Sequence, residues 1–474
     1  MKKTAMNPYL PLYEYIPDAE PRVFEDRLYV YGSHDLAGGE KGYCAGDYMV
    51  WSAPLDDLGD WRCDGVSYHR TDALDFQSEI DALPAPDVVQ GPDGRYYLYY
   101  NTRYNKSCAV AVSERPEGPF TFYGLVHTPD GEPYRAVKMF DPGVLVDDGR
   151  VFLYTGFSPS LHFQGNPENA ATHSLVCELC ADMVTMKELP RPLIPGHFAA
   201  VGTDFEGHGF YEASSPRKIN GKYIFVYSSE QSHELCYAVS DYPDRDYHYM
   251  GVLVSNADFG LDKIQAPAAP YGNNHGGLVQ LNGDWYIFYH RQTHAVECCR
   301  QGCAEKLPVR EDGWFGQAAI TSYGLNGAPL KAEGEINAAY CCYLMSPAIR
   351  NAILSPRENA RDREPHIYEE IGPNGGYIHY IANITRGTAA GYNSFSFAGE
   401  YTVRLKMRGN GKGRVSLHLD AKENVPAAQT TWNGNSDWTD IALIMQADGA
   451  HKLYIVFDVD AAVDFQSLVF EQNR

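Results

Sequence analysis

Hydrophobic and polar positions alternate along roughly the first 290 residues in a unit that recurs five times. The unit is a short strand, a turn rich in Gly, Asp or Asn, and a second strand rich in aromatic residues. Its copies occupy residues 23–31, 88–100, 144–154, 217–227 and 278–289. Alternation on both sides of such a turn predicts a β-hairpin. Each hairpin leaves room for two further strands, so the pattern favours a five-bladed β-propeller with four strands per blade over an all-β sandwich.

The hairpins place ionisable side chains at one recurring position, eleven residues before an aromatic residue of the second strand. In chain order this position holds Asp18, Pro86 with Asp87 beside it, Asp141, Glu212 and His275. Side chains alternate between the two faces of a strand, so equal register in equivalent strands predicts equal direction. The inner strand of a blade begins at the propeller axis, and we therefore expect these side chains to converge there.

Three converging carboxylates fit the hydrolysis of a glycosidic bond with inversion. One carboxylic acid protonates the leaving oxygen, and a carboxylate roughly 6.5 to 9.5 Å away activates water. A third carboxylate raises the pKa of the acid through its negative charge, which keeps the acid protonated near neutral pH. Acidic residues at strand starts also cap turns or accept backbone hydrogen bonds, and this structural role is the alternative for each residue taken alone.

The motifs around these residues resemble glycoside hydrolase family 43, whose members are five-bladed propellers acting on polysaccharides that contain arabinose and xylose. The resemblance covers roughly residues 7 to 343. It rests on Asn7-Pro8 with Pro17-Asp18, Ala85-Pro86-Asp87-Val88, Phe140-Asp141-Pro142-Gly143, Tyr211-Glu212-Ala213-Ser214 and Tyr289-His290-Arg291. These strings are specific as a set, although each one is short.

The resemblance implies a role for each acid. Asp18 is expected as the general base, Asp141 as the residue that orients the acid and modulates its pKa, and Glu212 as the general acid. The family commonly reads Asp-Pro-Ser at the base, so the dipeptide Glu20-Pro21 competes with Asp18 for that position. The hairpin register favours Asp18, because Glu20 would need a two-residue deletion before Tyr29.

Substrate and metal contacts are implied as well. Asp87 and Arg291 are expected to bind substrate, and the planar guanidinium of Arg291 suits pairs of sugar hydroxyls or a carboxylate. His275 resembles a histidine that lies near a calcium ion or a water cluster on the propeller axis; no cofactor is expected to be required, and a structural calcium ion is optional. A core histidine and a blade-packing arginine are the structural alternatives. His34 and Asp35 follow the first hairpin and are interpreted as turn residues.

Composition limits the partners. The formal net charge of −22 opposes binding to nucleic acid or to an anionic membrane, which leaves a small neutral oligosaccharide as the expected partner. No apolar run follows the N-terminal lysines or approaches the length of a membrane-spanning helix, so we expect a cytoplasmic protein.

Eleven cysteines in a long chain favour reduced thiols. Two cysteine groups lack the further ligands of a closed zinc site, namely Cys177 with Cys180 and Cys298, Cys299 with Cys303.

A second domain follows the propeller. Residues 1–345 are assigned to the propeller and residues 346–474 to a β-sandwich, which a polar stretch from Ser346 to Pro365 introduces. Alternation returns at residues 394–397, 401–407, 414–419 and 452–457. The order of these strands resembles the jelly-roll of carbohydrate-binding module family 6. Trp432 and Tyr392 are candidates for stacking on sugar, and a module that only packs against the propeller is the alternative.

The expected function is that of an inverting exo-glycoside hydrolase. The resemblance implies release of terminal α-L-arabinofuranose, β-D-xylose or both from oligosaccharides of arabinoxylan or arabinan. Endo-α-1,5-L-arabinanase activity is the alternative among hydrolases; a non-catalytic carbohydrate-binding propeller, a calcium-binding scaffold and a transferase are alternatives of other classes. A raised pKa of Glu212 separates an enzyme from a binder, because a pure binder gains nothing from a protonated acid.

Overall fold

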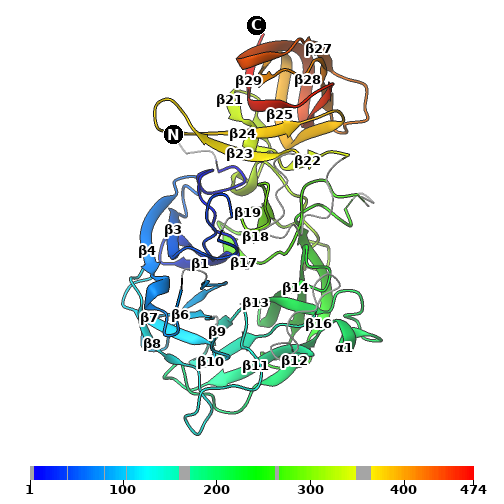
Figure 1. Cartoon of the computed structure of the whole chain (residues 1–474). Helices are drawn as coiled ribbons and strands as arrows, with labels where there is room; N and C mark the ends of the chain where they lie inside the picture. Colours follow the sequence, from blue (N-terminus) through cyan, green and yellow to red (C-terminus); the bar gives the residue numbers. More distant parts are fainter. Residues whose placement is uncertain are drawn as a thin grey trace.

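The computed structural model of the chain describes residues 5–39, 41–78, 81–102, 104–159, 171–261, 266–347 and 364–473. Its regular structure is almost entirely β-strand, with a ring of sheets and a second domain stacked on one side of the ring (Figure 1). The helical segments are short: α1 (His197–Ala200) and three 3-10 turns at Arg70–Asp72, Gly324–Asn326 and Ala338–Tyr340. Within the described ranges, no helix has the length and apolar character that crossing a membrane demands.

Five antiparallel sheets form the blades of a propeller, as predicted. The first blade contains β1 (Glu20–Phe24), β2 (Arg27–Tyr31), β3 (Tyr48–Pro54) and β4 (Arg62–Tyr68). The second contains β5 (Asp87–Gln90), β6 (Tyr96–Tyr100), β7 (Ala109–Ser113) and β8 (Thr121–Leu125). The third contains β9 (Gly143–Asp147), β10 (Arg150–Thr155), β11 (His173–Leu179) and β12 (Arg191–Pro195). The fourth contains β13 (Phe210–Ile219), β14 (Lys222–Ser229), β15 (Glu234–Ser240) and β16 (His248–Ser255).

The fifth blade contains β17 (Leu278–Leu281), β18 (Asp284–Gln292) and β19 (Arg300–Lys306). It has three strands among the described residues, so the prediction of four strands in every blade is wrong here. The chain after β19 forms a short turn closed by a bridge between Val309 and Phe315. It then pairs at Ala318 with Val254 of the fourth blade instead of adding an outer strand to its own.

All five predicted hairpins are present, and their turns explain why. The turns of the third, fourth and fifth hairpins are Asp148-Gly149, Asn220-Gly221 and Asn282-Gly283, and every one of these residues has a positive φ. Two successive positive φ angles give the turn whose twist matches that of a two-stranded ribbon, and Asp, Asn and Gly adopt them at the lowest cost. The local sequence therefore fixes the register of each inner pair of strands.

The C-terminal domain is one connected sheet of ten strands around a hydrophobic core. Its main path contains β23 (His366–Ile371), β24 (Tyr377–Ile384), β29 (Val463–Gln472), β25 (Thr388–Gly409), β28 (Asn435–Val459), β26 (Gly413–Leu419) and β27 (Ala428–Trp432). All four predicted strands lie in this sheet, and the first two are parts of the single long strand β25. Residues 348–363 of the predicted linker lie outside the described residues.

The C-terminal sheet also includes strands that precede residue 346. Three short strands before that point join the C-terminal sheet, namely β20 (Leu330–Lys331), β21 (Gly334–Asn337) and β22 (Tyr343–Met345). They pair with β25 and β29, which lie more than 40 residues further along the chain. Because long-range pairing of this kind leaves no signal in the local pattern, we propose that the boundary lies just before Leu330.

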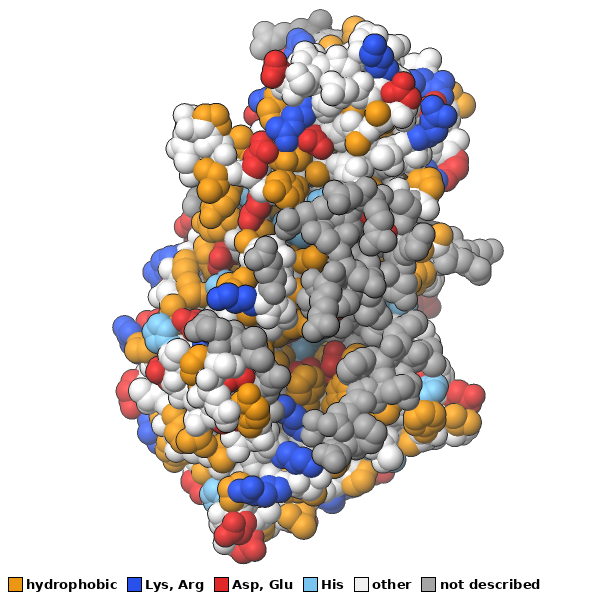
Figure 2. Space-filling model, viewed as in Figure 1, with side chains coloured by type: hydrophobic (Ala, Val, Ile, Leu, Met, Phe, Trp, Pro, Cys, Tyr) orange, Lys and Arg blue, Asp and Glu red, His pale blue; other side chains and the backbone are white. Residues whose placement is uncertain are grey.

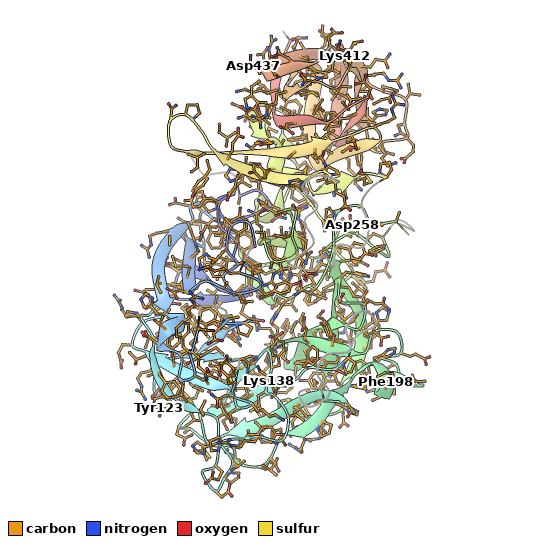
Figure 3. All side chains as sticks on the ribbon, in the orientation of Figure 1. Tyr123, Lys138, Phe198, Asp258, Lys412 and Asp437 are labelled. Carbon is orange, nitrogen blue, oxygen red and sulfur yellow. The ribbon has the colours of Figure 1, made fainter. Side chains whose placement is uncertain are left out.

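Buried polar contacts join the two domains. Asp258, at the junction in Figure 3, accepts hydrogen bonds from the hydroxyl of Tyr343 at 2.9 Å and from the backbone of Ile320 at 2.8 Å. The ring of Tyr343 also stacks on Tyr454 of the C-terminal sheet. On the surface shown in Figure 2, basic and acidic side chains are interspersed over both domains.

Candidate active site

A cavity of about 360 Å³ lies where the inner strands of the blades begin, within the size range of ligand pockets. Three groups of side chains line it. The ionisable ones are Asp18, Cys44, Asp141, Glu212, His275, Glu297 and Arg300. The aromatic ones are Tyr43, Phe140, Phe157 and Tyr211. The remaining ones are Pro84, Ala85, Ser232 and Asn273.

The structure brings the three predicted acids together in this cavity. Asp18 and Asp141 each stand two residues before an inner strand, and Glu212 lies near the start of β13. Their exposed fractions are 4%, 4% and 9%. Asp18 and Asp141 have positive φ angles of 57° and 45°, which L-residues rarely adopt outside functional sites and turns. The shared register and the shared backbone conformation together aim the side chains at the axis.

Asp18 is surrounded by donors. One carboxylate oxygen accepts a hydrogen bond from Nη1 of Arg300 at 2.8 Å, and the other accepts one from the hydroxyl of Ser33 at 2.6 Å. The ring nitrogen Nδ1 of His290 lies 3.2 Å from the carboxylate and accepts a hydrogen bond from the backbone N–H of Asp18, also at 3.2 Å. Burial raises the pKa of Asp18, but the charge of Arg300 and the contact with His290 outweigh it and hold that pKa well below its ordinary value. Asp18 is therefore ionised at neutral pH.

Asp141 is fixed from three directions. Its backbone N–H donates to Oδ1 of Asn101 at 2.8 Å, and its carboxylate accepts a hydrogen bond from the backbone of Ala213 at 3.2 Å. Nδ1 of His275 lies 3.4 Å from the same carboxylate oxygen. Burial raises the pKa of Asp141, and the contact with His275 partly offsets this. Burial lowers the pKa of His275, but its contact with Asp141 more than compensates and raises that pKa to about 9.

Glu212 has the opposite environment to Asp18. Among the described residues, no side chain or backbone group donates a hydrogen bond to its carboxyl group. Burial raises the pKa of Glu212 well above its ordinary value, and the negative charge of Asp141 raises it further. The cavity therefore holds two carboxyl groups whose pKa values are displaced in opposite directions, that of Asp18 downward and that of Glu212 upward.

Gly143 lets Asp141 reach Glu212. A Cβ atom at this position would lie 2.1 Å from the carbonyl oxygen of Ser214 on β13, a distance that no side chain tolerates. The absence of a side chain allows β9 and β13 of neighbouring blades to approach closely at their inner ends. The string Asp141-Pro142-Gly143 therefore supplies both the carboxylate and the close packing that places it beside the acid.

Asp87, which is predicted to bind substrate, does not line the cavity. It is fully buried, and its carboxylate accepts hydrogen bonds from Nη2 of Arg22 at 2.5 Å and from the backbone of Val144 at 2.8 Å. These contacts connect three blades. The recurring position holds Pro86, and a shift of one residue turns a strand side chain to the other face.

Arg291 is also not a cavity residue. Its guanidinium donates to the carbonyl oxygens of Cys341 and Cys342 at 3.3 and 2.8 Å, and so it holds the chain that leaves the fifth blade. The preceding residue His290 is the one that faces Asp18, and successive side chains of β18 point to opposite faces. Of this motif, His290 therefore contacts Asp18, whereas Arg291 contacts the chain beyond the fifth blade.

Arg300 is the arginine of the cavity, and sequence analysis missed it. It is 1% exposed, and Asp18 and Asp35 both accept hydrogen bonds from its guanidinium. Asp35, interpreted as a turn residue, is fully buried and also accepts a hydrogen bond from the backbone of Cys44. Two carboxylates around one guanidinium satisfy its charge and fix its plane. Arg300 is the first residue of β19, and the local pattern of that strand gives no sign of its partners.

Aromatic rings form one wall of the cavity. Phe157 lies edge-on to Phe140 with ring centroids 5.8 Å apart, and it packs on Tyr211 at 5.4 Å. Tyr43 lies beneath the guanidinium of Arg300, whose central carbon is 4.8 Å from the ring centroid. Apolar rings beside a few converging polar groups are typical of small-molecule sites. This wall gives the cavity one apolar side.

Glu20 is the acid that competed with Asp18 in the sequence, and the structure gives it a different place. One of its carboxylate oxygens accepts a hydrogen bond from Nη2 of Arg217 at 2.7 Å. The other, Oε1, is buried without a hydrogen-bond partner among the described residues and lies 4.0 Å from Nε2 of His275. Glu20 does not line the cavity but lies behind it, next to the axial histidine.

All eleven cysteines are free and nine of them are buried, three of these in strands, namely Cys177, Cys236 and Cys303.

In the C-terminal sheet, the two aromatic candidates for sugar stacking are enclosed. Trp432 is 3% exposed and Tyr392 is fully buried, with its hydroxyl donating to the carbonyl oxygen of Ala338. Neither ring is available to a ligand on the surface.

Comparison with known proteins assigns a family to this geometry. The family model described as "Glycosyl hydrolases family 43" matches residues 17–315, which include Asp18, Asp141, Glu212 and Arg300. A protein named "Xylosidase/arabinosidase" from Thermoclostridium stercorarium is 39% identical over 487 aligned residues, which cover 98% of this chain and 99% of that protein.

Solved structures share the fold. One is a "GH43 beta-xylosidase/alpha-arabinofuranosidase from a compost microbial metagenome in complex with xylotriose, calcium-free form"; it is 25% identical, with a TM-score of 0.53, over 67% of this chain and 98% of that one. An arabinoxylan arabinofuranohydrolase from Bacillus subtilis, solved in complex with cellotetraose, covers 99% of both chains with a TM-score of 0.51. At 19% identity, the latter is a likeness of fold alone.

Proposed function

Because the chain belongs to glycosyl hydrolase family 43, we propose that it is an inverting exo-glycoside hydrolase that releases terminal α-L-arabinofuranose and β-D-xylose from short oligosaccharides. The observation that carries the proposal is the pair of opposite environments in one cavity. The carboxylate of Asp18 lies against the guanidinium of Arg300, which lowers its pKa, whereas burial and the charge of Asp141 raise the pKa of Glu212. A site that only binds sugar gains nothing from such a pair.

The two groups divide the proton transfers between them. Glu212 gives its proton to the glycosidic oxygen as the bond from that oxygen to the anomeric carbon breaks. A water molecule attacks the same carbon from the opposite side, and Asp18 takes the proton that this water loses. Asp141 keeps Glu212 protonated before the reaction, and Arg300 keeps Asp18 ionised. Single displacement by water inverts the anomeric configuration.

The sugar preference rests on the relatives and on the size of the cavity. The relative from Thermoclostridium stercorarium is named for both xylosidase and arabinosidase activity. A cavity of about 360 Å³ is at the small end of ligand pockets, which suits terminal sugar units better than the middle of a long chain. Terminal arabinofuranose and xylose present similar hydroxyl groups, so one pocket can accept both.

We also propose that the reaction does not require calcium. Two groups would hold the ion. Nε2 of His275 would be a ligand, and the unpartnered Oε1 of Glu20 would accept hydrogen bonds from water molecules bound to the ion. Calcium prefers six to eight oxygen ligands. Two protein groups supply few of them, and Arg217 already neutralises Glu20. Activity should therefore persist after treatment with EDTA; a complete loss that added Ca²⁺ restores would contradict this proposal.

Release of 4-nitrophenol from the α-L-arabinofuranoside and the β-D-xyloside tests the function. Wild type should cleave both, and Asp18→Asn should lose activity by at least about 10²-fold because Asn cannot take a proton. Asp148→Asn is the matched control, since Asp148 also has a positive φ but lies exposed in a turn. A wild type inert on both sugars would overturn the proposal. The anomer first seen by proton NMR distinguishes inversion from retention.

A further inference from the structure

Three different metal-binding side chains meet in the fourth blade, away from the groups that carry the proposed reaction. Glu234 and Cys236 occupy alternate positions of β15, so their side chains share one face of the blade. His208 stands two residues before β13 and reaches the same face. Among the residues that the structure describes, no other set of three His, Cys, Asp or Glu side chains gathers its ligand atoms within 4.8 Å.

The distances between the three ligand atoms approach those of a tetrahedral zinc site. Nδ1 of His208 lies 2.6 Å from Oε1 of Glu234, and Sγ of Cys236 lies 3.4 Å from that oxygen and 3.9 Å from that nitrogen. Zinc bonds of about 2.0 to 2.3 Å at tetrahedral angles require about 3.3 Å between nitrogen and oxygen and about 3.6 Å from sulfur to each. The sulfur is in place, and the imidazole and carboxylate need to separate by about 0.7 Å.

The neighbours of these side chains hold them in position. The ring of Tyr249 stacks on His208 with centroids 4.8 Å apart and an angle of 13° between the planes. The hydroxyl of Tyr227 donates to the carbonyl oxygen of His208 at 2.9 Å, and the hydroxyl of Ser229 donates to Oε1 of Glu234 at 2.6 Å. Such outer contacts orient metal ligands and are a regular part of metal sites.

An ion can reach this cluster from solvent. The side chain of His208 is 34% exposed, whereas that of Glu234 is 8% exposed and Cys236 is fully buried. An entering ion therefore meets the imidazole of His208 first, and the thiol of Cys236 is the most deeply buried ligand. Metal binding converts the thiol into a thiolate, so each ion that binds releases one proton from Cys236 and a second from His208 when that ring is protonated.

We propose that His208, Glu234 and Cys236 bind a zinc ion through Nδ1, Oε1 and Sγ, with water as the fourth ligand. One sulfur, one imidazole and one carboxylate match the ligand preferences of Zn²⁺, and hard cations such as Ca²⁺ and Mg²⁺ avoid thiolates. The site is separate from the axial His275, and it does not depend on the proposed function.

Titration of the full chain with Co²⁺ tests the proposal, because cobalt bound to a thiolate absorbs light where the protein does not. The protein is first treated with a chelator, desalted and kept reduced with a phosphine. We expect a charge-transfer band with one-to-one stoichiometry, together with the visible bands of tetrahedral cobalt, and their loss when Zn²⁺ is added. A wild type without the charge-transfer band overturns the proposal.

Variants assign the band to the cluster. Cys236→Ser should remove the charge-transfer band, and His208→Gln should weaken Co²⁺ binding at least tenfold. Cys177→Ser is the matched control, because Cys177 is a buried strand cysteine of the third blade that lies outside the cluster. A band that persists in Cys236→Ser, or that disappears in Cys177→Ser, contradicts the assignment. Should Cys236→Ser fail to fold by circular dichroism, His208→Gln at the half-exposed ligand decides the question.

Discussion

Arg300 should set the acidic limit of the pH range in which the enzyme works. Its guanidinium lies 2.8 Å from Asp18 and is, after burial, the strongest influence on the pKa of that carboxylate. An adjacent arginine lowers the pKa of an aspartate by about 1 to 3 units, which corresponds to about 1.4 to 4 kcal/mol. Without it, burial dominates and the pKa of Asp18 rises. The base must be ionised, so activity is then lost at a higher pH as the solution is acidified.

Replacement of Arg300 needs a second substitution, at Asp35. Arg300 also pairs with the fully buried Asp35, and removing one partner of a buried pair costs about 3 to 5 kcal/mol of stability. The variant is therefore Arg300→Met in an Asp35→Asn background. Arg300→Lys in the same background is the control, because it differs from the Met variant mainly by one positive charge beside Asp18.

The assay is kcat/KM for the nitrophenyl arabinofuranoside measured from about pH 3 to 8, which reports the pKa values of the free enzyme. We expect kcat/KM of the Met variant to fall on the acidic side at a pH about 1 to 3 units above that of the Lys control. The position of the limb is the readout, because a lower rate alone would also follow from a lost sugar contact. Coincident limbs in the two variants would refute the assigned influence of Arg300 on Asp18.

Three further substitutions test other parts of the site. Glu212→Gln removes the proton donor and should lower the rate on xylobiose by about 10² to 10⁴-fold. The loss should be smaller on the nitrophenyl xyloside, because its leaving group needs little protonation. Equal losses on the two substrates would argue against a general acid. Asp141→Asn removes the negative charge that raises the pKa of Glu212, so the basic limb of the pH profile should move to lower pH, and an unmoved limb would contradict the modulating role. Asp87→Asn leaves Arg22 without its buried partner and should lower the free energy of unfolding in urea by about 3 to 5 kcal/mol. KM should stay unchanged. A raised KM in a stable variant would indicate that Asp87 contacts the substrate.

The fold and the axial residues could be predicted because both depend on short-range pattern. Turn residues with positive φ determine each hairpin, and each hairpin determines the register that aims Asp18, Asp141, Glu212 and His275 at the cavity. The same rule explains why Asp87 and Arg291, both predicted to bind substrate, do not line the cavity. Asp87 stands one residue beyond the recurring position, and Arg291 stands one residue beyond His290, so both side chains face away from the cavity.

Contacts between distant segments could not be predicted in this way. Arg300 reaches Asp18 across 282 positions of sequence and Asp35 across 265. β20, β21 and β22 join strands of the second domain, and the predicted boundary missed them. A single sequence contains the pattern of each strand but not its long-range partners, which the closure of the ring and the packing of the two domains determine.

The chemical roles of the acids follow from these long-range partners rather than from the register. Asp18 and Glu212 occupy equivalent positions in two hairpins, yet the pKa of Asp18 is lowered and that of Glu212 is raised. The difference arises because β19 of the fifth blade delivers Arg300 to Asp18, whereas β9 of the third blade delivers another carboxylate, Asp141, to the neighbourhood of Glu212. The propeller therefore repeats one geometry, and the residue that each neighbouring blade contributes determines the direction in which the pKa of the carboxyl group moves.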